Sequence, residues 1–167
     1  MRIGHIGTSI SLNQVVLNQM VIQQEQGHDV VSVCADDQWA EAVKARGIRV
    51  IDVALARHKP LATLSATKQL WDVCRRERFD VVHTHNSLPG LAGRIAARLA
   101  SVPAVVHTCH AWPLHQPRSP LFSATYRVLE TLAACAADAT LFQNPDDMRR
   151  CIDLKVVPEH KATLIGN

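Results

Sequence analysis

Short apolar runs alternate with longer segments of helical periodicity along the whole chain. The runs are rich in Val and Ile, which is typical of buried strands. The segments between them repeat apolar residues at three- and four-residue spacing, which is typical of helices. Strands are expected at residues 3–6, 29–34, 48–53, 80–84, 104–109 and 139–142, with one more strand-like piece at 162–165.

This alternation predicts the architecture. Parallel strands need a crossover that carries the chain back over the sheet, and helices in the crossovers cover both faces. The sequence therefore predicts an α/β fold, a Rossmann-like parallel β-sheet with helices on both faces, formed as a single domain by residues 1–167. A chain of this length can bury a core without disulfides or a structural metal.

Local signals place several helix features. Ser11, with a glutamine three residues later, is expected to begin the first helix as a capping box. Asn144 is expected to cap the last helix. Arg94 and Arg98 are expected on the solvent side of a helix at 88–100. Apolar stripes are expected on two further helices, one formed by Leu61, Leu64, Trp71 and Cys74 and the other by Phe122, Tyr126, Leu129, Ala133 and Ala136.

Composition excludes several classes of protein. The net charge of +3 is too small to indicate a nucleic-acid partner, and no basic run is interleaved with aromatic residues. No apolar stretch approaches the length of a membrane span. The cysteines are odd in number and lack a Cys-x-x-Cys pair, which favours a reduced, cytoplasmic setting; they are Cys34, Cys74, Cys109, Cys135 and Cys151.

Ligands of parallel sheets collect at the carboxyl ends of the strands. Two histidine-rich motifs stand at such ends, HTHNSLPG at 83–90 and HTCHAW at 107–112. Because side chains alternate between the faces of a strand, His83 and His107 are expected as hydrogen-bonded core residues. His85 and His110 come last and are expected to point into the cleft. A zinc site built on His-x-His and another His is the rival reading, but no carboxylate or thiolate has convincing spacing, so no metal is expected.

The first strand leads into a loop with Gly7, Thr8 and Ser9, ahead of a helix whose free amides can receive an anion or a sugar hydroxyl. The loop lacks the Gly-x-Gly-x-x-Gly pattern of dinucleotide sites. Asp36, after the second strand, is expected as a solvated turn carboxylate. The loop can thus receive an anion or a sugar hydroxyl, but it does not encode a dinucleotide site.

The stretch AWPLHQPRSP carries three prolines together with Trp112 and Leu114. Exposed apolar groups on a stiff loop indicate a binding lip for the lipid of an acceptor or for an anionic surface such as the inner face of a membrane. Packing of Trp112 beneath the loop is an equal alternative.

The segment FDVVHTHNSLPGLAGRIAARLASVPAVVHTCHAW and the tail KATLIGN resemble the N-terminal domain of retaining GT-B glycosyltransferases of family four, the group that includes glycogen synthase and phosphatidylinositol mannosyltransferases. In that family a histidine at the position of His110 faces the reacting sugar. Family members usually follow an Asn like Asn167 with a linker and a donor-binding domain, so the resemblance implies that this C-terminal domain is absent from the 167 residues.

The resemblance implies transfer of a sugar from a nucleotide-sugar donor to a glycan, lipid or small-molecule acceptor, with retention and without metal or other cofactor. His110 is then the catalytic candidate, and His85, Asn86, Gly7, Thr8, Ser9, Trp112 and Asn144 are candidates for acceptor or sugar binding. Two alternatives stay open: a non-catalytic binding module of the same fold that partners a separate catalytic chain, and half of a nucleotide-sugar epimerase.

Overall fold

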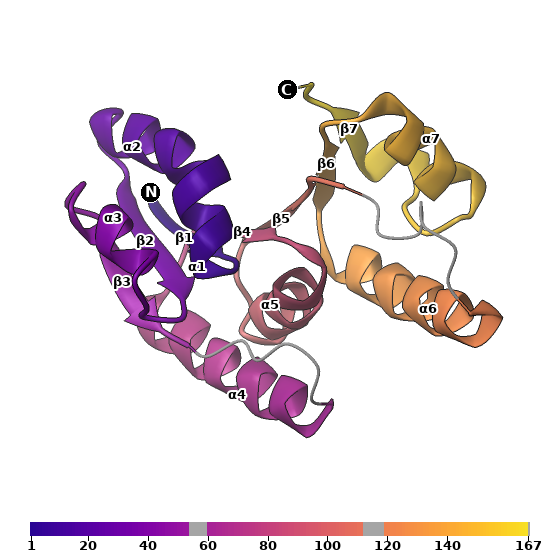
Figure 1. Cartoon of the computed structure of the whole chain (residues 1–167), viewed down its shortest axis with the longest axis horizontal. Coiled ribbons are helices and arrows are strands. Elements are labelled where there is room, and N and C mark those ends of the chain that lie inside the picture. Colours follow the sequence, from indigo (N-terminus) through magenta and orange to yellow (C-terminus); the bar gives the residue numbers. More distant parts are fainter. Residues whose placement is uncertain (54–59, 112–118, 167) are drawn as a thin grey trace.

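A computed structural model describes residues 1–53, 60–111 and 119–166. Its centre is a seven-stranded sheet in the order β3-β2-β1-β4-β5-β6-β7, and every neighbouring pair is parallel (Figure 1). The predicted α/β class is confirmed, and the strand-like piece near the end of the chain is a true edge strand. The strands are β1 Arg2–Ile6, β2 Asp29–Cys34, β3 Arg49–Asp52, β4 Val81–His85, β5 Ala104–Cys109, β6 Ala139–Phe142 and β7 Ala162–Leu164.

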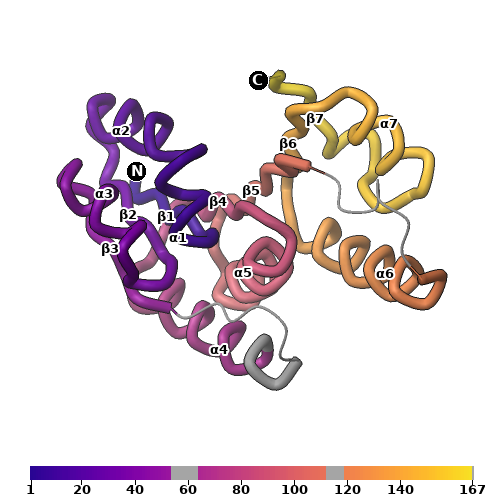
Figure 2. The backbone as a smooth tube through the Cα atoms, in the orientation of Figure 1, coloured from indigo at the N-terminus to yellow at the C-terminus, as the bar shows by residue number. Residues whose placement is uncertain are grey.

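Helices cover both faces of the sheet, as Figures 1 and 2 show. One core cluster joins β1 and β2 to α4 and α5, and a second joins β2 to the first helical segments and α3. A third lies among α6, β6 and α7. The helices are α1 Ser9–Ser11, the π-helical turn η1 Leu12–Val16, α2 Leu17–Glu25, α3 Ala40–Lys44, α4 Pro60–Glu77, α5 Ser87–Leu99, α6 Pro120–Ala136, α7 Pro145–Asp153 and the 3₁₀ turn η3 Glu159–Lys161.

The expected capping box at Ser11 is wrong. The helix begins two residues earlier, after Thr8, and Ser11 is buried within it and makes no capping bond. The carbonyl of Thr8 accepts the amide hydrogen of Leu12 at 2.9 Å. Leu12 and Val16 are fully buried, so apolar packing, rather than the serine side chain, decides where this helix lies.

The expectation for Arg94 is also wrong. Its side chain is only 1% exposed and pairs with Glu130 of α6 at 2.7 Å, because α6 packs against this side of α5. Arg98, one turn later, is 42% exposed and pairs with Asp138, as expected for the solvent side.

The apolar stripes are confirmed only in part. Trp71 and Cys74 pack into the core, whereas Leu64 is 70% exposed, and the side chain of Leu61 lies outside the described residues. On α6, Ala133 is buried as expected, but Phe122 and Leu129 are exposed. Three other apolar side chains of this helix are exposed as well: Leu121, Val128 and Leu132. Helical period therefore located these helices but did not fix which face each one buries.

The last helix begins as predicted. The side chain of Asn144 accepts the amide hydrogen of Asp146 at 2.8 Å, and Pro145 occupies the first helical position. All five cysteines are free thiols. None of the helices in the described part of the chain is long and apolar enough to cross a membrane.

Candidate functional site

The strand order reverses direction between β1 and β4, which lie side by side at the centre of the sheet. The chain leaves β1 towards α1 and leaves β4 towards α5, and these helices cover opposite faces. A crevice forms where neighbouring crossovers diverge in this way, and it is the usual ligand site of an open parallel sheet. The candidate residues Gly7, Thr8, Ser9, His85 and Asn86 all follow these two strands.

Asn86 joins the two sides of this crevice. Its side-chain oxygen accepts hydrogens from the amide and hydroxyl of Thr8, at 3.2 and 3.3 Å, and its amide nitrogen donates to Ser11 Oγ at 3.2 Å. Its backbone has φ 64° and ψ 163°, a region that residues other than glycine rarely enter. The predicted meeting of the first loop with the end of β4 is therefore present, and it holds one residue in a strained conformation.

The first loop lines a groove together with a carboxylate that the sequence analysis did not select. Ser9 is buried and donates from Oγ to Asp37 at 2.7 Å, and this hydrogen bond is the main reason that the pKa of Asp37 is lowered. Thr8 and Trp39 line the same groove. Asp36 is half-exposed and pairs with Lys44, which agrees with the solvated turn carboxylate that was expected.

Gly7 packs too tightly for any larger residue. A Cβ atom at this position would lie 2.9 Å from Leu12 Cδ2 and 3.4 Å from His85 Cβ. The glycine is thus required by the close approach of the loop to its own helix and to β4, whatever ligand the loop receives.

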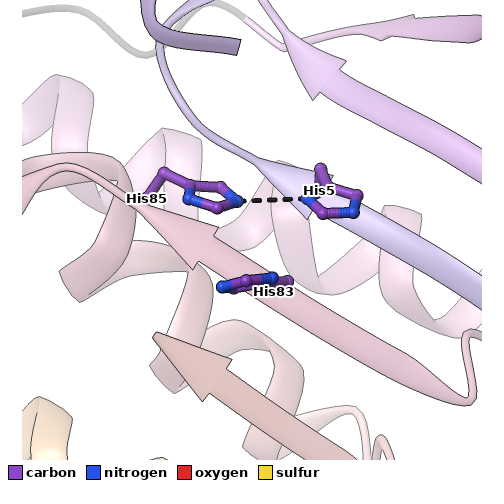
Figure 3. A group of neighbouring side chains, drawn as sticks. All are labelled: His5, His83 and His85. Carbon is purple, nitrogen blue, oxygen red and sulfur yellow. Dashed lines mark hydrogen bonds between the residues drawn. The ribbon is translucent and has the colours of Figure 1, made fainter. Parts of the chain in front are cut away.

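Histidines form the interior of the site, and one of them, His5, carried no sequence signal. His5 on β1 lies opposite His83 on β4, and it contacts His85 through a 3.1 Å separation between its Nδ1 and His85 Nε2 (Figure 3). His85 Nδ1 in turn lies 3.2 Å from His110 Nε2. Three imidazoles therefore stand in a line from β1 across β4 to the end of β5.

Glutamines stand at both ends of this line. Gln23 Oε1 of α2 lies 2.7 Å from His5 Nε2, and Gln143 Oε1, just after β6, lies 3.0 Å from His110 Nδ1. Both ring nitrogens of His5, of His85 and of His110 consequently have partners. We name the five side chains Gln23, His5, His85, His110 and Gln143 the imidazole line.

Burial keeps these rings neutral. Desolvation lowers the pKa of His5 to about 4, and it also lowers the pKa of His85, which is fully buried, and that of His110, which is partly exposed. His85 was expected to point into an open cleft, and this is wrong because none of its side chain reaches solvent. Only His110 presents an imidazole of the line towards open space.

His83 and His107 are hydrogen-bonded core residues, as predicted, but they face opposite sides of the sheet. His83 Nε2 lies 2.7 Å from Thr108 Oγ1, and His107 Nδ1 lies 2.9 Å from Thr84 Oγ1. His107 contacts α5 so closely that a Cβ on Gly90 would come within 2.6 Å of its ring. Desolvation lowers the pKa of His83 to about 3.

A cavity of about 170 Å³ lies beside His110 and is lined by residues of β5, β6, α5, α6 and α7. Thr140 Oγ1, on its wall, is buried and has no hydrogen-bond partner among the described residues. The wall thus presents imidazole, hydroxyl and ion-pair groups to a polar ligand. Besides Thr140, its polar side chains are Asn86, Arg94, His107, His110, Tyr126 and Glu130.

A metal site here would be formed by a cluster of three histidines, His5, His83 and His85. Each offers a ring nitrogen, and these atoms lie within 4.8 Å of one another. The cluster contains no carboxylate or thiolate to balance a buried dication. A cation here would also displace the hydrogen bond between His5 and His85.

Two candidates remain, Trp112 and Asn144. Trp112 lies outside the described residues, as does Leu114. Asn144 is exposed, and its side-chain oxygen accepts the capping hydrogen bond at the start of α7.

The chain matches known proteins over nearly its whole length. Residues 12–167 match the family described as glycosyl transferase 4-like domain. An Escherichia coli UDP-Gal:alpha-D-GlcNAc-diphosphoundecaprenol alpha-1,3-galactosyltransferase is 28% identical over 161 residues, which cover 93% of this chain and 41% of that enzyme. The chain therefore spans less than half the length of this relative.

Solved structures share the fold at low identity. A glycosyltransferase from Rickettsia africae superposes with a TM-score of 0.71 at 14% identity, over 99% of this chain and 42% of that one. MurG of Acinetobacter baumannii gives 0.68 at 14%, over 98% and 45%. A UDP-GlcNAc 2-epimerase from Neisseria meningitidis, bound to UDP-GlcNAc, gives 0.71 at 17%, over 100% and 47%. At these identities the likeness concerns the fold.

Proposed function

Because this chain belongs to the family of glycosyl transferase 4-like domains, we propose that it is the acceptor-side, N-terminal half of a glycosyltransferase. The full protein moves a sugar from a nucleotide-sugar donor to an acceptor, with retention and without a metal. A C-terminal domain of the same protein holds the donor nucleotide, and the reaction takes place in the cleft between the two halves.

The observation that carries this proposal is the position of His110. It directly follows β5 at the carboxyl edge of the sheet, it is neutral, and it borders a cavity whose wall also carries a hydroxyl that no described residue hydrogen-bonds. A neutral imidazole is suited to a hydrogen bond with a sugar hydroxyl, and such a bond fixes the orientation of the reacting ring.

The activity of the Escherichia coli relative suggests the substrates. That enzyme uses UDP-galactose and an acceptor sugar linked to undecaprenol by diphosphate. We therefore propose a UDP-sugar as donor and a lipid-linked sugar as acceptor, which brings the protein to a membrane surface without requiring it to cross the bilayer.

The test uses the full-length protein, UDP-galactose and a polyprenyl diphosphate-linked N-acetylglucosamine acceptor. His110→Ala is expected to lower turnover at least about tenfold, which equals about 1.4 kcal/mol of transition-state stabilisation, and to leave the melting temperature nearly unchanged. His160→Ala, at an exposed histidine of η3, is the matched control and should retain full activity.

Unchanged turnover in His110→Ala, or a loss explained by unfolding, contradicts the role of this histidine. Incubation of the parent protein with UDP-GlcNAc alone tests the epimerase alternative, since an epimerase converts the donor sugar without any acceptor. Conversion under those conditions, with no transfer to the lipid, would replace the proposed activity.

A further inference from the structure

The cavity beside His110 contains a hydroxyl that forms no hydrogen bond within the described ranges of the chain. Thr140 of β6 is 2% exposed, and its Oγ1 is buried without a partner there. The threonines of the neighbouring strands differ, because Thr84 of β4 and Thr108 of β5 each lie within hydrogen-bond distance of a histidine ring. A buried hydroxyl without a partner destabilises a fold, so its presence needs an explanation.

The side chain of Thr140 projects into the space between the sheet and the helices that cover it. Thr140 is the register partner of His107, and side chains of directly paired residues lie on the same face of a sheet. The ring of His107 contacts α5 at Gly90. Thr140 therefore faces the cavity from the sheet, and residues of α5, α6 and α7 form the other walls.

The cavity is large enough for a small organic group. Its volume is about 170 Å³. A water molecule needs roughly 10–15 Å³ of such space, and a cavity of about 150 Å³ can hold benzene. The lining includes Asn86, His110 and Ala111, which follow the carboxyl ends of β4 and β5. The cavity thus extends to the edge of the sheet where the proposed reaction takes place.

The lining is polar but offers no uncompensated charge. Arg94 and Glu130 form a buried ion pair at 2.7 Å, and burial lowers the pKa of His107, which keeps that ring neutral. A phosphate or carboxylate would enter without a counter-charge, and burying an uncompensated charge is costly. The same lining includes the apolar side chains of Phe142 and Val156. The cavity therefore suits a neutral group that has one polar and one apolar end.

The proposed acceptor carries such a group. The Escherichia coli relative adds galactose to N-acetylglucosamine through an α-1,3 linkage. In that acceptor the acetamido group is bonded to C2, the carbon next to the one that carries the reacting hydroxyl. An acetamido group is neutral and smaller than benzene, and it combines a carbonyl with a methyl group. A reacting hydroxyl held at the carboxyl edge near His110 would place this group at the cavity.

We propose that this cavity is the subsite for the 2-acetamido group of the acceptor sugar, and that Thr140 Oγ1 donates a hydrogen bond to the acetamido carbonyl. This inference rests on the proposed function and adds to it a residue that selects the acceptor. The acetamido methyl packs against Phe142 and Val156. A glucose acceptor has only a hydroxyl at C2, so it leaves the cavity unfilled and Thr140 unpartnered. The subsite therefore favours N-acetylglucosamine over glucose.

Transfer assays on the full-length protein compare two polyprenyl diphosphate-linked acceptors, N-acetylglucosamine and glucose, with UDP-galactose as donor. The parent protein is expected to show a kcat/KM at least about tenfold higher for N-acetylglucosamine. Thr140→Val keeps the shape of the side chain and removes the hydroxyl, so this ratio should fall about fivefold, the usual effect of one neutral hydrogen bond. Thr163→Val, at an exposed threonine of β7, is the matched control and should keep the ratio of the parent.

A second variant fills the cavity. Cys151 of α7 lines it, and the longer, flexible side chain in Cys151→Met should occupy its apolar part. The ratio of kcat/KM for the two acceptors should then fall close to one. Without acceptor, Thr140→Val should melt no lower than the parent, because the hydroxyl that it removes is bonded to no described residue. A cavity that holds only water predicts instead the same ratio in all four proteins, and that result overturns the subsite.

Saturation-transfer NMR gives a readout that does not depend on transfer. The probe is the methyl α-glycoside of N-acetylglucosamine, and the parent protein should saturate its acetyl methyl more than its ring protons. Thr140→Val and Cys151→Met should weaken this signal, whereas Thr163→Val should not. Acetyl saturation no stronger than that of the ring protons in the parent overturns the subsite.

The two readouts separate this inference from the function on which it rests. Absence of transfer in every protein, with the expected acetyl saturation and its loss in Cys151→Met, defeats the proposed function and leaves the subsite intact. Transfer with an unchanged acceptor ratio in both Thr140→Val and Cys151→Met defeats the subsite alone.

Discussion

Asn86 combines a backbone conformation suited to glycine with a side chain that no glycine can replace. Its amide holds Thr8 and Ser11 against the end of β4, while its φ of 64° costs conformational energy. The two effects oppose each other, and substitution separates them.

Asn86→Ala is expected to lose the hydrogen bonds and to keep the backbone strain. Asn86→Gly loses the same hydrogen bonds but relieves the strain. The alanine variant should therefore unfold more easily than the glycine variant, by about 1–3 kcal/mol in urea titrations. Equal stabilities, or a more stable alanine variant, would mean that the conformation of Asn86 is not strained.

Single residues of the site could be predicted only where a motif marked them. His110 and Asn86 stand in strand-end motifs, and the structure brings both to one edge of the sheet. His5 lies alone in a short strand, and its part in the line depends on the register of β1 against β4, which no local pattern encodes. Asp37 was missed because its partner, Ser9, comes from a different crossover.

At the level of helices and strands, a buried ion pair joins α5 to α6. Arg94 Nη2 donates to Glu130 at 2.7 Å, and Arg94 Nε donates to the carbonyl of Gly90 at 2.8 Å. Removing one partner leaves the other charge buried without compensation, which costs far more than the pair itself contributes.

Arg94→Met is expected to destabilise the protein by about 3–5 kcal/mol, and the double variant Arg94→Met/Glu130→Leu should regain most of that loss. Arg98→Ala, which breaks the exposed pair with Asp138 on the same helix, should cost at most about 1 kcal/mol. Chemical denaturation of the four proteins measures these differences, and a double variant no better than Arg94→Met would refute the argument.

The positions of helices and strands were easier to predict than which face of each helix is buried. Every predicted strand is present within one or two residues, because buried parallel strands are runs of Val and Ile that helices do not resemble. Arg94 was misplaced because its helix is covered by α6 as well as by the sheet, and arginine is rarely buried unless paired. Whether a second helix covers a given face is a property of the tertiary structure.

For the whole molecule, five buried or half-buried histidines link stability to pH. The pKa of each is lower in the folded protein than in the unfolded chain, reaching about 4 for His5 and about 3 for His83; the others are His85, His107 and His110. The unfolded chain therefore binds more protons below its own histidine pKa of about 6.5. Stability is fully present above that pH and falls as the pH decreases towards 4.

The melting temperature is accordingly expected to be flat from pH 8 to 7 and to fall steeply from pH 6.5 to 4.5. Each histidine contributes up to about 1.4 kcal/mol per pH unit in that window. Calorimetry across this range checks the prediction, and a melting temperature that stays constant down to pH 5 would contradict it.

The pairing of β1 with β4 has a consequence for the order in which the chain folds. β1, β2 and β3 join through short crossovers, as do β4, β5, β6 and β7, but Ile3 meets Val81 only when the long intervening chain is closed. Closing a long loop costs entropy before any contact repays it. The two groups of strands, β1 to β3 and β4 to β7, are therefore expected to form first, and the pairing of β1 with β4 last. Because the imidazole line crosses from β1 to β4, the chain is expected to complete its binding site in the final step of folding.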